Sequence, residues 1–583
     1  MTKRSSISAA VLLTAAVLLT GSAGAQEAPP VFDEAVDVRV VNVETYVTDK
    51  DGNPITGLTR DDFELIVDGK RVEITNFYAE TDGRTSMVEE VVLDDSRQEP
   101  FHSAELSEIG PPERRLHLAV YVDHTRLQPA NRQRAFKALR EALLTQLVAG
   151  DQVSVVSFAN SLVFHSDFLY DRDAVDEILD EISSTSARTN VNRLERRQII
   201  GELNRGQSGG LLAANSIATM QTDVLLTRIR AYAQEEYNRS LVSIRQLEQI
   251  TATLSGLPGR KAILYVSEGI PNRPGEELYN EFVNRTGTEN PGMRGVNYNT
   301  NYAREVGNFE IERDIDRLTR RANEASVTLY ALDANPDHRT DLRSALSEQG
   351  AISTTLTIVG DNFREPLEQA AQATGGRRLQ ASGRLEKELV KMVRGFGTFY
   401  SLGFMPATWV KGDNHSIRVK VKDRGLRVRH REEYGLVSED DEAAQATVTA
   451  LLYRAGANPL GITLHPGTTT PRDDGNGVLP VLVDIPIEKL TLLPQGETHS
   501  VRLTLYVSVK DKKGNPGKIQ KIPFGLNIPS DKVPEASTQS AHYSLPVVLR
   551  LGDQQVAVGV RDQQSKLLST VRLDVDQYSA ILR

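Results

Sequence analysis

Cysteine is absent from all 583 residues. Disulfide bonds, zinc–thiolate sites and cysteine nucleophiles are therefore excluded, and stability must come from packed cores. Histidine is also scarce, at ten residues, and no His-Glu-x-x-His zinc motif occurs. The formal net charge is -10, which argues against nucleic acid as a main partner because phosphate binding needs a concentrated positive field.

Long apolar runs are missing beyond the N-terminus. No later segment reaches the roughly 18 uncharged apolar residues of a membrane-spanning helix, so none is expected in the mature chain. At the N-terminus, Lys3 and Arg4 precede the apolar run 9–20 and small residues that end at Ala25. This pattern predicts a signal peptide, residues 1–25, and an exported protein that is periplasmic or extracellular.

Catalytic motifs are equally rare. Residues 206–210 spell Gly-x-Ser-x-Gly, but they lie between two helical stretches, whereas a nucleophile elbow requires a strand-to-helix turn. We interpret them as a helix break. No glycine-rich phosphate loop follows a strand with the required spacing, so we do not expect an enzyme.

The central feature that is present is the apolar run Leu116 to Val122, followed by Asp123. It is typical of a parallel strand that is buried on both faces. Further strands are expected at 153–158, 162–164, 262–266, 327–332 and 378–379, with helices at 129–149, 173–182, 309–325, 363–373 and 384–395. The alternation predicts an α/β fold, with a Rossmann-like, mostly parallel sheet and one antiparallel edge.

Residues 211–255 contain no glycine or proline and carry an apolar stripe at helical spacing. They predict one long helix within a helical insertion at about 185–255, which also includes a helix near 189–204. The insertion could project as a hairpin and contact a partner. It could equally pack along its own domain, as amphipathic stripes usually do. Two polar loops, 271–308 and 334–360, are expected at the carboxyl edge of the sheet.

Antiparallel β modules are expected on both sides of the α/β domain. Residues 417–421 and 426–429 alternate apolar and basic side chains around a turn, which predicts a hairpin whose basic face is solvated or contacts an anionic glycan or lipid surface. The expected order is a small β module 36–80, a linker 81–114, the α/β domain 115–396, the hairpin extension 397–435, a linker 436–478 and a β-sandwich 479–583.

Several short motifs together resemble a von Willebrand factor A (VWFA) domain, and more narrowly the VWFA-related domain proteins found among secreted acidobacterial proteins. They are Asp123 after its strand, Gly150-Asp151-Gln152-Val153, Gly259-Arg260-Lys261-Ala262, Ser267-Glu268-Gly269 and Leu329 to Asp333, with Gly57 to Phe63 before the domain and Tyr400 to Phe404 after it. The resemblance covers about 36–435.

The resemblance implies a divalent-cation site built from an Asp-x-Ser-x-Ser motif, a later Thr and an Asp after the fourth strand. Asp123 and Thr125 match the first two ligands, Leu127 cannot ligate, and Glu268 stands where the later Asp is expected. Thr189 is the candidate for the loop Thr. A degenerate site for Mg²⁺ or Ca²⁺ would follow. Alternatively, Asp123 and Glu268 are polar caps on buried strands.

We therefore expect an exported, non-enzymatic binding or adhesion-type protein that contacts a protein or cell-surface ligand at the carboxyl rim of its sheet. The alternatives are an envelope scaffold that acts through the helical insertion and an atypical envelope hydrolase. The rim residues predicted to contact the ligand are Asp123, His124, Thr125, Glu268, Asp333, Tyr298 and Tyr302.

Overall fold

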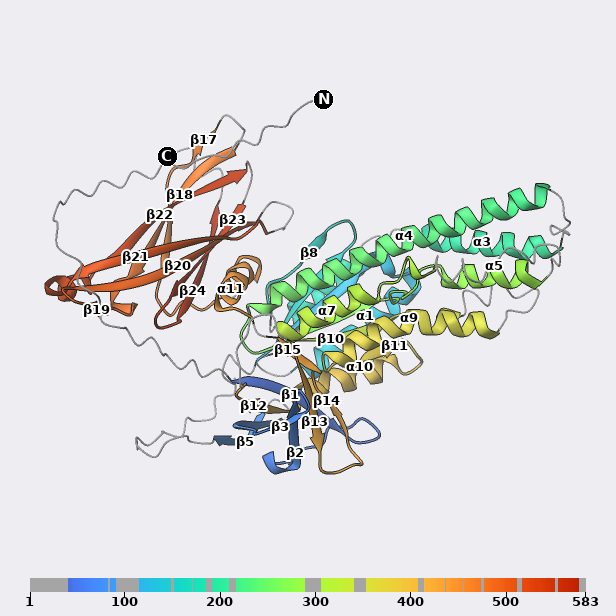
Figure 1. Ribbon diagram of the computed structural model, residues 1–583, viewed down its shortest axis with the longest axis horizontal. Coiled ribbons are helices and arrows are strands. Elements are labelled where there is room, and N and C mark those ends of the chain that lie inside the picture. Colours follow the sequence, from blue (N-terminus) through green and yellow to red (C-terminus); the bar gives the residue numbers. More distant parts are fainter. Residues whose placement is uncertain are drawn as a thin grey trace. The chain divides into compact units, whose positions relative to one another are not determined.

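The computed structural model describes residues 40–81, 84–90, 115–147, 151–169, 171–184, 191–208, 216–288, 306–339, 353–406, 414–435, 437–453, 456–472, 476–510, 516–550 and 554–575 (Figure 1). The predicted signal peptide lies outside these residues, as do Thr189, Tyr298 and Tyr302. All described residues fall within one compact unit, Val40–Arg583.

A six-stranded sheet forms the centre of the α/β domain, with strand order β11-β10-β9-β6-β7-β8. All neighbours are parallel except β7 and β8, which confirms the mostly parallel sheet with one antiparallel edge. Counted along the chain the order is 3-2-1-4-5-6, that of doubly wound nucleotide-binding folds. The strands are β6 (Leu116–Asp123), β7 (Gln152–Phe158), β8 (Leu162–Phe164), β9 (Arg260–Ser267), β10 (Val327–Asp333) and β11 (Arg378–Gln380).

Helices cover both faces of this sheet, because alternate residues of β6 contribute to two separate apolar cores. Leu118, Val120 and Val122 pack against α1 (Pro129–Gln146), α2 (Arg172–Ser184) and α10 (Leu385–Arg394). Ala119 and Tyr121 pack in the other core, with α4 (Ser216–Ser255), α7 (Glu312–Glu324) and α9 (Ser353–Ala373). The absence of alternation in the sequence of β6 follows from this double coverage.

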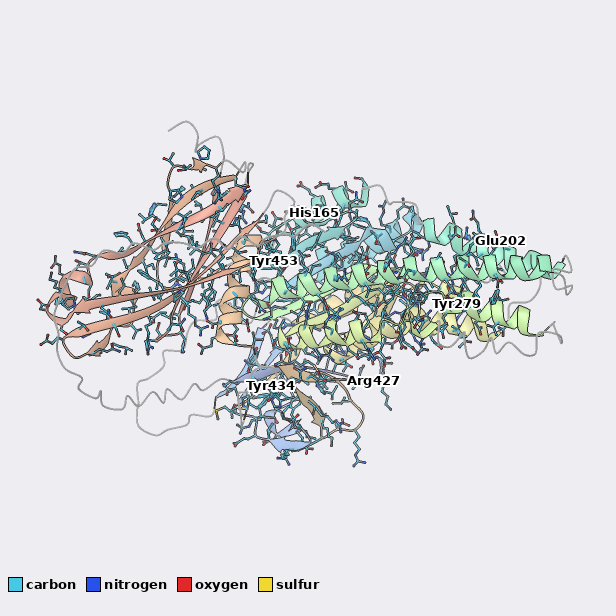
Figure 2. All side chains as sticks on the ribbon, turned by 45° about the horizontal axis from the view of Figure 1, so that its top comes forward. His165, Glu202, Tyr279, Arg427, Tyr434 and Tyr453 are labelled. Carbon is cyan, nitrogen blue, oxygen red and sulfur yellow. The ribbon has the colours of Figure 1, made fainter. Side chains whose placement is uncertain are left out.

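A third core belongs to helices that extend beyond the sheet. It joins α3 (Val191–Ser208), α5 (Glu276–Thr288), and the first halves of α4 and α9 through residues such as Ile199, Ile229, Leu278 and Val359. Tyr279, labelled in Figure 2, is buried in it. We call these four helical segments the helical cap. The insertion therefore packs on the sheet through the second half of α4 and extends beyond the sheet through its first half, while contact with a partner stays a prediction.

Two predicted loops contain helices instead. Helix α5 lies in the first half of the expected loop 271–308, and α9 begins at Ser353, inside the expected loop 334–360. Both predictions were wrong for these helical residues, because their local composition is rich in polar residues; residues 289–305 and 340–352 lie outside the described part of the chain. The short apolar stripe of Leu278, Tyr279 and Phe282 reaches a core only when α3 and α4 are present.

One two-sheet β module is built from both flanks of the α/β domain. Strand β1 pairs with β12 and β14, and β2 pairs with β13. The predicted hairpin is wrong, since β13 and β14 belong to different sheets that enclose one core. The strands are β1 (Val41–Thr48), β2 (Phe63–Val67), β3 (Lys70–Val72), β4 (Asn76–Thr81), β5 (Arg84–Glu90), β12 (Phe399–Phe404), β13 (Asn414–Val421), β14 (Arg427–Arg429) and β15 (Glu433–Gly435); β5 lies in the expected linker 81–114.

The C-terminal region consists of two antiparallel sheets that share one apolar core. The expected linker 436–478 contains regular structure, including helix α11 (Glu439–Tyr453). No helix in the described ranges is long and apolar enough to cross a membrane. The elements are β16 (Thr463–Pro466), β17 (Thr470–Pro471), β18 (Asn476–Pro486), β19 (Leu493–Gln495), β20 (Thr498–Lys510), β21 (Gln520–Pro529), α12 (Val533–Ala536), β22 (Ser540–Arg550), β23 (Gln554–Asp562) and β24 (Leu568–Val575).

Candidate functional site

The strand order identifies one position on the sheet where a ligand site is expected. From β6 the chain continues to β7 on one side, whereas β9, on the other side of β6, leads on to β10. In open α/β sheets, ligands bind at the carboxyl ends of the strands where the order reverses in this way. Asp123 ends β6, Ser267 ends β9, and Glu268 follows directly after it. The sequence predicted Asp123 and Glu268 at the carboxyl edge of the sheet, and in the structure both lie at this switch point.

The Asp123 carboxylate is fully buried and saturated with hydrogen bonds. One oxygen accepts from the Thr125 backbone N–H at 3.0 Å and from the Thr125 hydroxyl at 2.5 Å. The other accepts from the Ser243 hydroxyl at 2.7 Å and the Tyr265 hydroxyl at 3.0 Å. A carboxylate offers about four acceptor positions, so these donors use them all.

Arg126 is the cation next to this carboxylate, and it is only 6% exposed. Its guanidinium pairs with Glu236 at 2.9 Å and donates to Ser243 at 3.0 Å, Ser240 at 3.0 Å and the Gly269 carbonyl at 3.3 Å. Gly269 has a φ of 82°, a left-handed conformation that favours glycine. Burial alone would lower the pKa of Arg126, but Glu236 raises it above its ordinary value.

Three partners in this network were missed by the sequence reasoning. Glu236, Ser240 and Ser243 lie on α4, within the stretch that the sequence predicted as a long helix with an apolar stripe. Their spacing of four and three residues places them on one face of the helix. A short polar patch on an otherwise amphipathic helix was the available signal, although nothing in the local sequence identifies Arg126 as its target.

The Glu268 carboxylate binds the N-terminus of helix α1 through hydrogen bonds. It accepts from the Gln128 backbone N–H at 2.6 Å, the Gln128 side chain at 2.8 Å and Asn131 at 3.0 Å. Gln128 is the N-cap residue of α1, where a carboxylate is favourable. Burial raises the pKa of Glu268. This contact matches the alternative in which Glu268 caps buried structure.

Asp333 ends β10 and is likewise fully buried. It accepts from His338 at 2.8 Å, from Arg378 at 2.6 Å and from the backbone N–H of Asn335 at 3.0 Å. Burial alone would raise the pKa of Asp333, but His338 and Arg378 lower it below its ordinary value. Asp333 therefore joins β10 to β11 rather than facing an open site.

His124 differs from these carboxylates because both ring nitrogens lack a hydrogen-bond partner within the described ranges. The side chain is 2% exposed, and burial lowers the pKa of His124 to about 4. The imidazole is consequently neutral at pH 7. The sequence predicted His124 as a rim residue that contacts the ligand, but its side chain is buried and does not reach the surface.

A divalent cation does not fit the described residues as they stand. The Asp123 acceptors are all in use, Glu268 is bonded to α1, and Leu127 packs in an apolar core at 4% exposure. Across the part of the chain that the structure describes, no group of three or more His, Asp or Glu side chains is arranged to hold a metal ion. Thr189 lies outside that part, so the predicted four-residue metal site stays a prediction.

An open groove of about 920 Å³ lies between α7 and α9 and includes Asn272 and Arg273, shortly after β9. Arg273 pairs with Glu310 at 2.7 Å, and Arg364 pairs with Asp361 at 3.0 Å. Acidic residues therefore dominate its charge. The lining carboxylates are Glu312, Asp316, Glu365, Glu368, Glu432 and Glu433, against three arginines, Arg273, Arg320 and Arg364.

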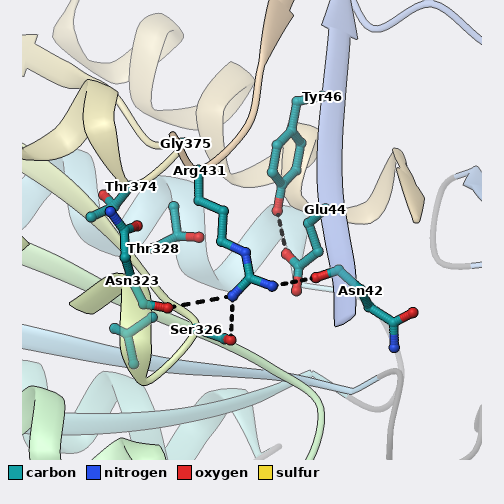
Figure 3. A pocket seen from close by; sticks show the side chains of 10 residues that line it. Asn42, Glu44, Tyr46, Asn323, Ser326, Thr328, Thr374, Gly375 and Arg431 are labelled. Atoms are coloured by element: carbon teal, nitrogen blue, oxygen red, sulfur yellow. Dashed lines mark hydrogen bonds between the residues drawn. The ribbon is translucent and has the colours of Figure 1, made fainter. Parts of the chain in front are cut away.

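A much smaller pocket, of about 30 Å³, lies between β1 and the end of α7 (Figure 3). Arg431 extends across it and donates to the backbone carbonyls of Asn42 at 2.6 Å and Asn323 at 3.4 Å, and to Ser326 at 2.5 Å. Burial lowers the pKa of Arg431 to about 10. The space suffices for about one water molecule, and Arg431 serves to join the β module to the α/β domain.

No protein-family model matches the chain, and no curated protein is similar enough to count as a match. Solved structures with partial similarity include an aerotolerance-related membrane protein from Bacteroides fragilis with multiple mutations to serine (9% identity, TM-score 0.22, 48% of this chain and 98% of that one). BatB from Bacteroides thetaiotaomicron, a conserved hypothetical protein, has 12% identity and a TM-score of 0.21 over 48% and 98%. A von Willebrand factor type A protein from Catenulispora acidiphila has 10% identity and a TM-score of 0.20 over 81% and 69%. These scores are too low to support an argument, so the fold class rests on the strand order.

Proposed function

We propose that this chain is an exported binding protein, without catalytic activity of its own, that contacts a protein or cell-surface ligand on the side of the α/β domain where the strands end. One observation carries the proposal. Asp123, Glu268 and Asp333 each use their carboxylates to fix neighbouring elements. Such an edge is a preorganised frame for recognition, whereas general acid–base chemistry needs a group that can reach a substrate proton.

The groove between α7 and α9, which begins beside Asn272 and Arg273 at this edge and runs along both helices, is the surface that best suits a partner. Two of its arginines are already paired, while Glu312 and Glu365 are exposed. Complementary charge favours association with a matching partner and suppresses others. A segment that carries lysine or arginine is therefore the expected contact.

A pull-down from envelope extract with the mature chain tests this proposal. We expect a specific partner to be retained by the wild type and lost by Glu312→Lys/Glu365→Lys, since the groove then changes sign. Asp531→Lys/Glu535→Lys is the matched control, because it makes the same charge change on exposed residues of the C-terminal region. An identical set of partners for the wild type and the groove variant would contradict the proposal.

A scaffold that acts through the helical cap is the second candidate. Leu194 on α3 and Val224 on α4 are large apolar side chains of the cap that are 51% and 62% exposed, so a partner could reach both. If the cap makes the contact, Leu194→Ser/Val224→Ser loses the partner and the groove variant keeps it.

The hydrolase alternative rests on one contact. The Ser157 hydroxyl lies 2.7 Å from Nε2 of His165, which is labelled in Figure 2. Within the described residues, no carboxylate is hydrogen-bonded to His165, so the orienting third group of a triad is not present there. Labelling by a fluorophosphonate probe that disappears in Ser157→Ala would favour the hydrolase; we expect no labelling of either protein.

A further inference from the structure

We propose that Arg126 takes the place of a divalent cation at the switch point, so that one side chain both compensates the charge of Asp123 and fastens the helical cap to the carboxyl edge of the sheet. This inference does not depend on the proposed function. It concerns how the site is built and which ions it can accept.

The first argument is the connection between the two charges. The Ser243 hydroxyl donates to Asp123 at 2.7 Å and accepts from the Arg126 Nε–H at 3.0 Å. A fully buried carboxylate is stable only when hydrogen bonds and a positive charge compensate its lost hydration. Arg126 provides that charge through a single bridging hydroxyl.

The second argument is the charge balance. Arg126 lies between two buried carboxylates, Asp123 and Glu236, and a second, partly exposed arginine, Arg239, approaches Glu236 at 3.7 Å and the exposed Glu235 at 3.9 Å. The two buried carboxylates therefore already face two cations. A divalent ion would add two uncompensated positive charges to this buried network, where the cost is largest. The network thus excludes Mg²⁺ and Ca²⁺ while Arg126 is present.

The third argument is the position of α4. Arg126 contacts three residues of this helix, Glu236, Ser240 and Ser243. Just before them, Ile229 and Ala233 belong to the core of the cap, and just after them Ile244 and Leu247 belong to the core on the sheet. The guanidinium therefore fixes the point where α4 passes from the cap onto the sheet.

The test compares the wild type with Arg126→Ala in thermal unfolding, first in EDTA and then in a series of Mg²⁺ and Mn²⁺ concentrations. For the wild type we expect a Tm that neither ion changes. For Arg126→Ala we expect a Tm lower by roughly 5 °C or more in EDTA and a saturable rise with Mn²⁺, because Asp123 then lacks its cation and Glu236 keeps only the partly exposed Arg239. The rise should vanish in Arg126→Ala/Asp123→Asn.

Arg140→Ala is the matched control, since the ion pairs of Arg140 within the described ranges are with Asp176 and Asp180 of α2, whose side chains are 42% and 76% exposed. If Arg126→Ala does not fold, Arg126→Lys keeps the charge but loses the fork of donors. It should stay insensitive to Mn²⁺ and show faster hydrogen exchange in α3, α4 and α5. A wild-type Tm that rises with Mg²⁺ would overturn the inference. So would an Arg126→Ala variant whose Tm and response to Mn²⁺ equal those of the wild type, or an Arg126→Lys variant whose hydrogen exchange in α3, α4 and α5 equals that of the wild type.

Discussion

Two buried arginines attach added modules to opposite edges of the central sheet. Arg126, at the carboxyl edge, fastens the helical cap. Arg260, at the amino edge and 3% exposed, fastens the β module: it donates to the Phe396 carbonyl at 2.5 Å and the Tyr46 hydroxyl at 3.2 Å, and it stacks 3.8 Å from the ring centre of Phe399. The two residues do the same mechanical task with different partners.

The two arginines differ in the carboxylates that would remain without a cation if the arginine were removed. Arg126 faces Glu236, whose side chain is only 8% exposed, and the buried Asp123. Arg260 donates hydrogen bonds to neutral groups, and its ion-pair partner Glu44 is 3.5 Å away and 27% exposed, while the charge of the buried Glu80 adds a further attraction. A buried anion without its cation is costly, whereas a partly exposed one can be hydrated. Burial of the partner, more than burial of the arginine, should therefore decide the cost of losing it.

The largest effect should come from Arg126→Ala. Removing one member of a buried ion pair costs about 3–5 kcal/mol, because the remaining charge stays in a dry environment. Urea unfolding at pH 7 measures this free energy. Arg126→Ala/Glu236→Gln should recover part of the loss; a loss below about 1 kcal/mol in the single variant would contradict the assignment of a buried pair.

The two edges should behave alike toward acid. His117 and His124 stand at opposite ends of β6, and burial lowers the pKa of each to about 4. The unfolded chain takes up these protons near pH 6.5, so the stability contribution is complete above that pH and is lost as the pH falls toward 4. Each histidine should cost on the order of 3 kcal/mol over this range.

The variants His117→Phe and His124→Phe measure the two contributions separately. Each should flatten the dependence of the unfolding free energy on pH between 6.5 and 4, by a similar amount, in urea titrations at several pH values. An unchanged pH dependence in either variant would show that its imidazole is accessible in the folded protein.

Arg260→Ala should cost less than Arg126→Ala, about 2 kcal/mol. The loss comprises hydrogen bonds from a charged donor and one cation–π contact, and Glu44, the carboxylate that pairs with Arg260, is partly exposed and can be hydrated. Thermal unfolding monitored by hydrogen exchange in β1 and β12 would measure it. A loss equal to that of Arg126→Ala would remove the distinction between the two edges.

The smallest effect should come from Glu44→Gln, below about 1 kcal/mol, since this pair is long and partly hydrated. Double-mutant cycles sharpen the contrast. The coupling energy of Arg260 with Glu44 should be below about 1 kcal/mol, and that of Arg126 with Glu236 above it. Equal coupling energies would indicate that exposure of the carboxylate does not matter here.

Features with a local signature were predictable from the sequence. Strand β6 is recognisable as an apolar run. Asp123 ends this strand and Glu268 directly follows β9, and because β6 and β9 are parallel neighbours the two residues lie at the same edge of the sheet. Contacts between distant residues were not predictable. Arg126 meets Glu236 across 110 positions, and the Leu58 N–H meets the Tyr400 hydroxyl across 342. Helix α5 and the first half of α9 were not predicted, because their apolar stripes form a core only together with α3 and α4.

The pairing of β1 has a consequence for the order of folding. Its two neighbours, β12 and β14, lie beyond residue 398, so the whole α/β domain separates them from β1 in the sequence. During synthesis from the N-terminus, β1 leaves the ribosome first and has no partner until some 350 further residues have followed. The first module in the sequence therefore closes only after the α/β domain has been synthesised, and it closes around a domain whose two ends have already been brought together.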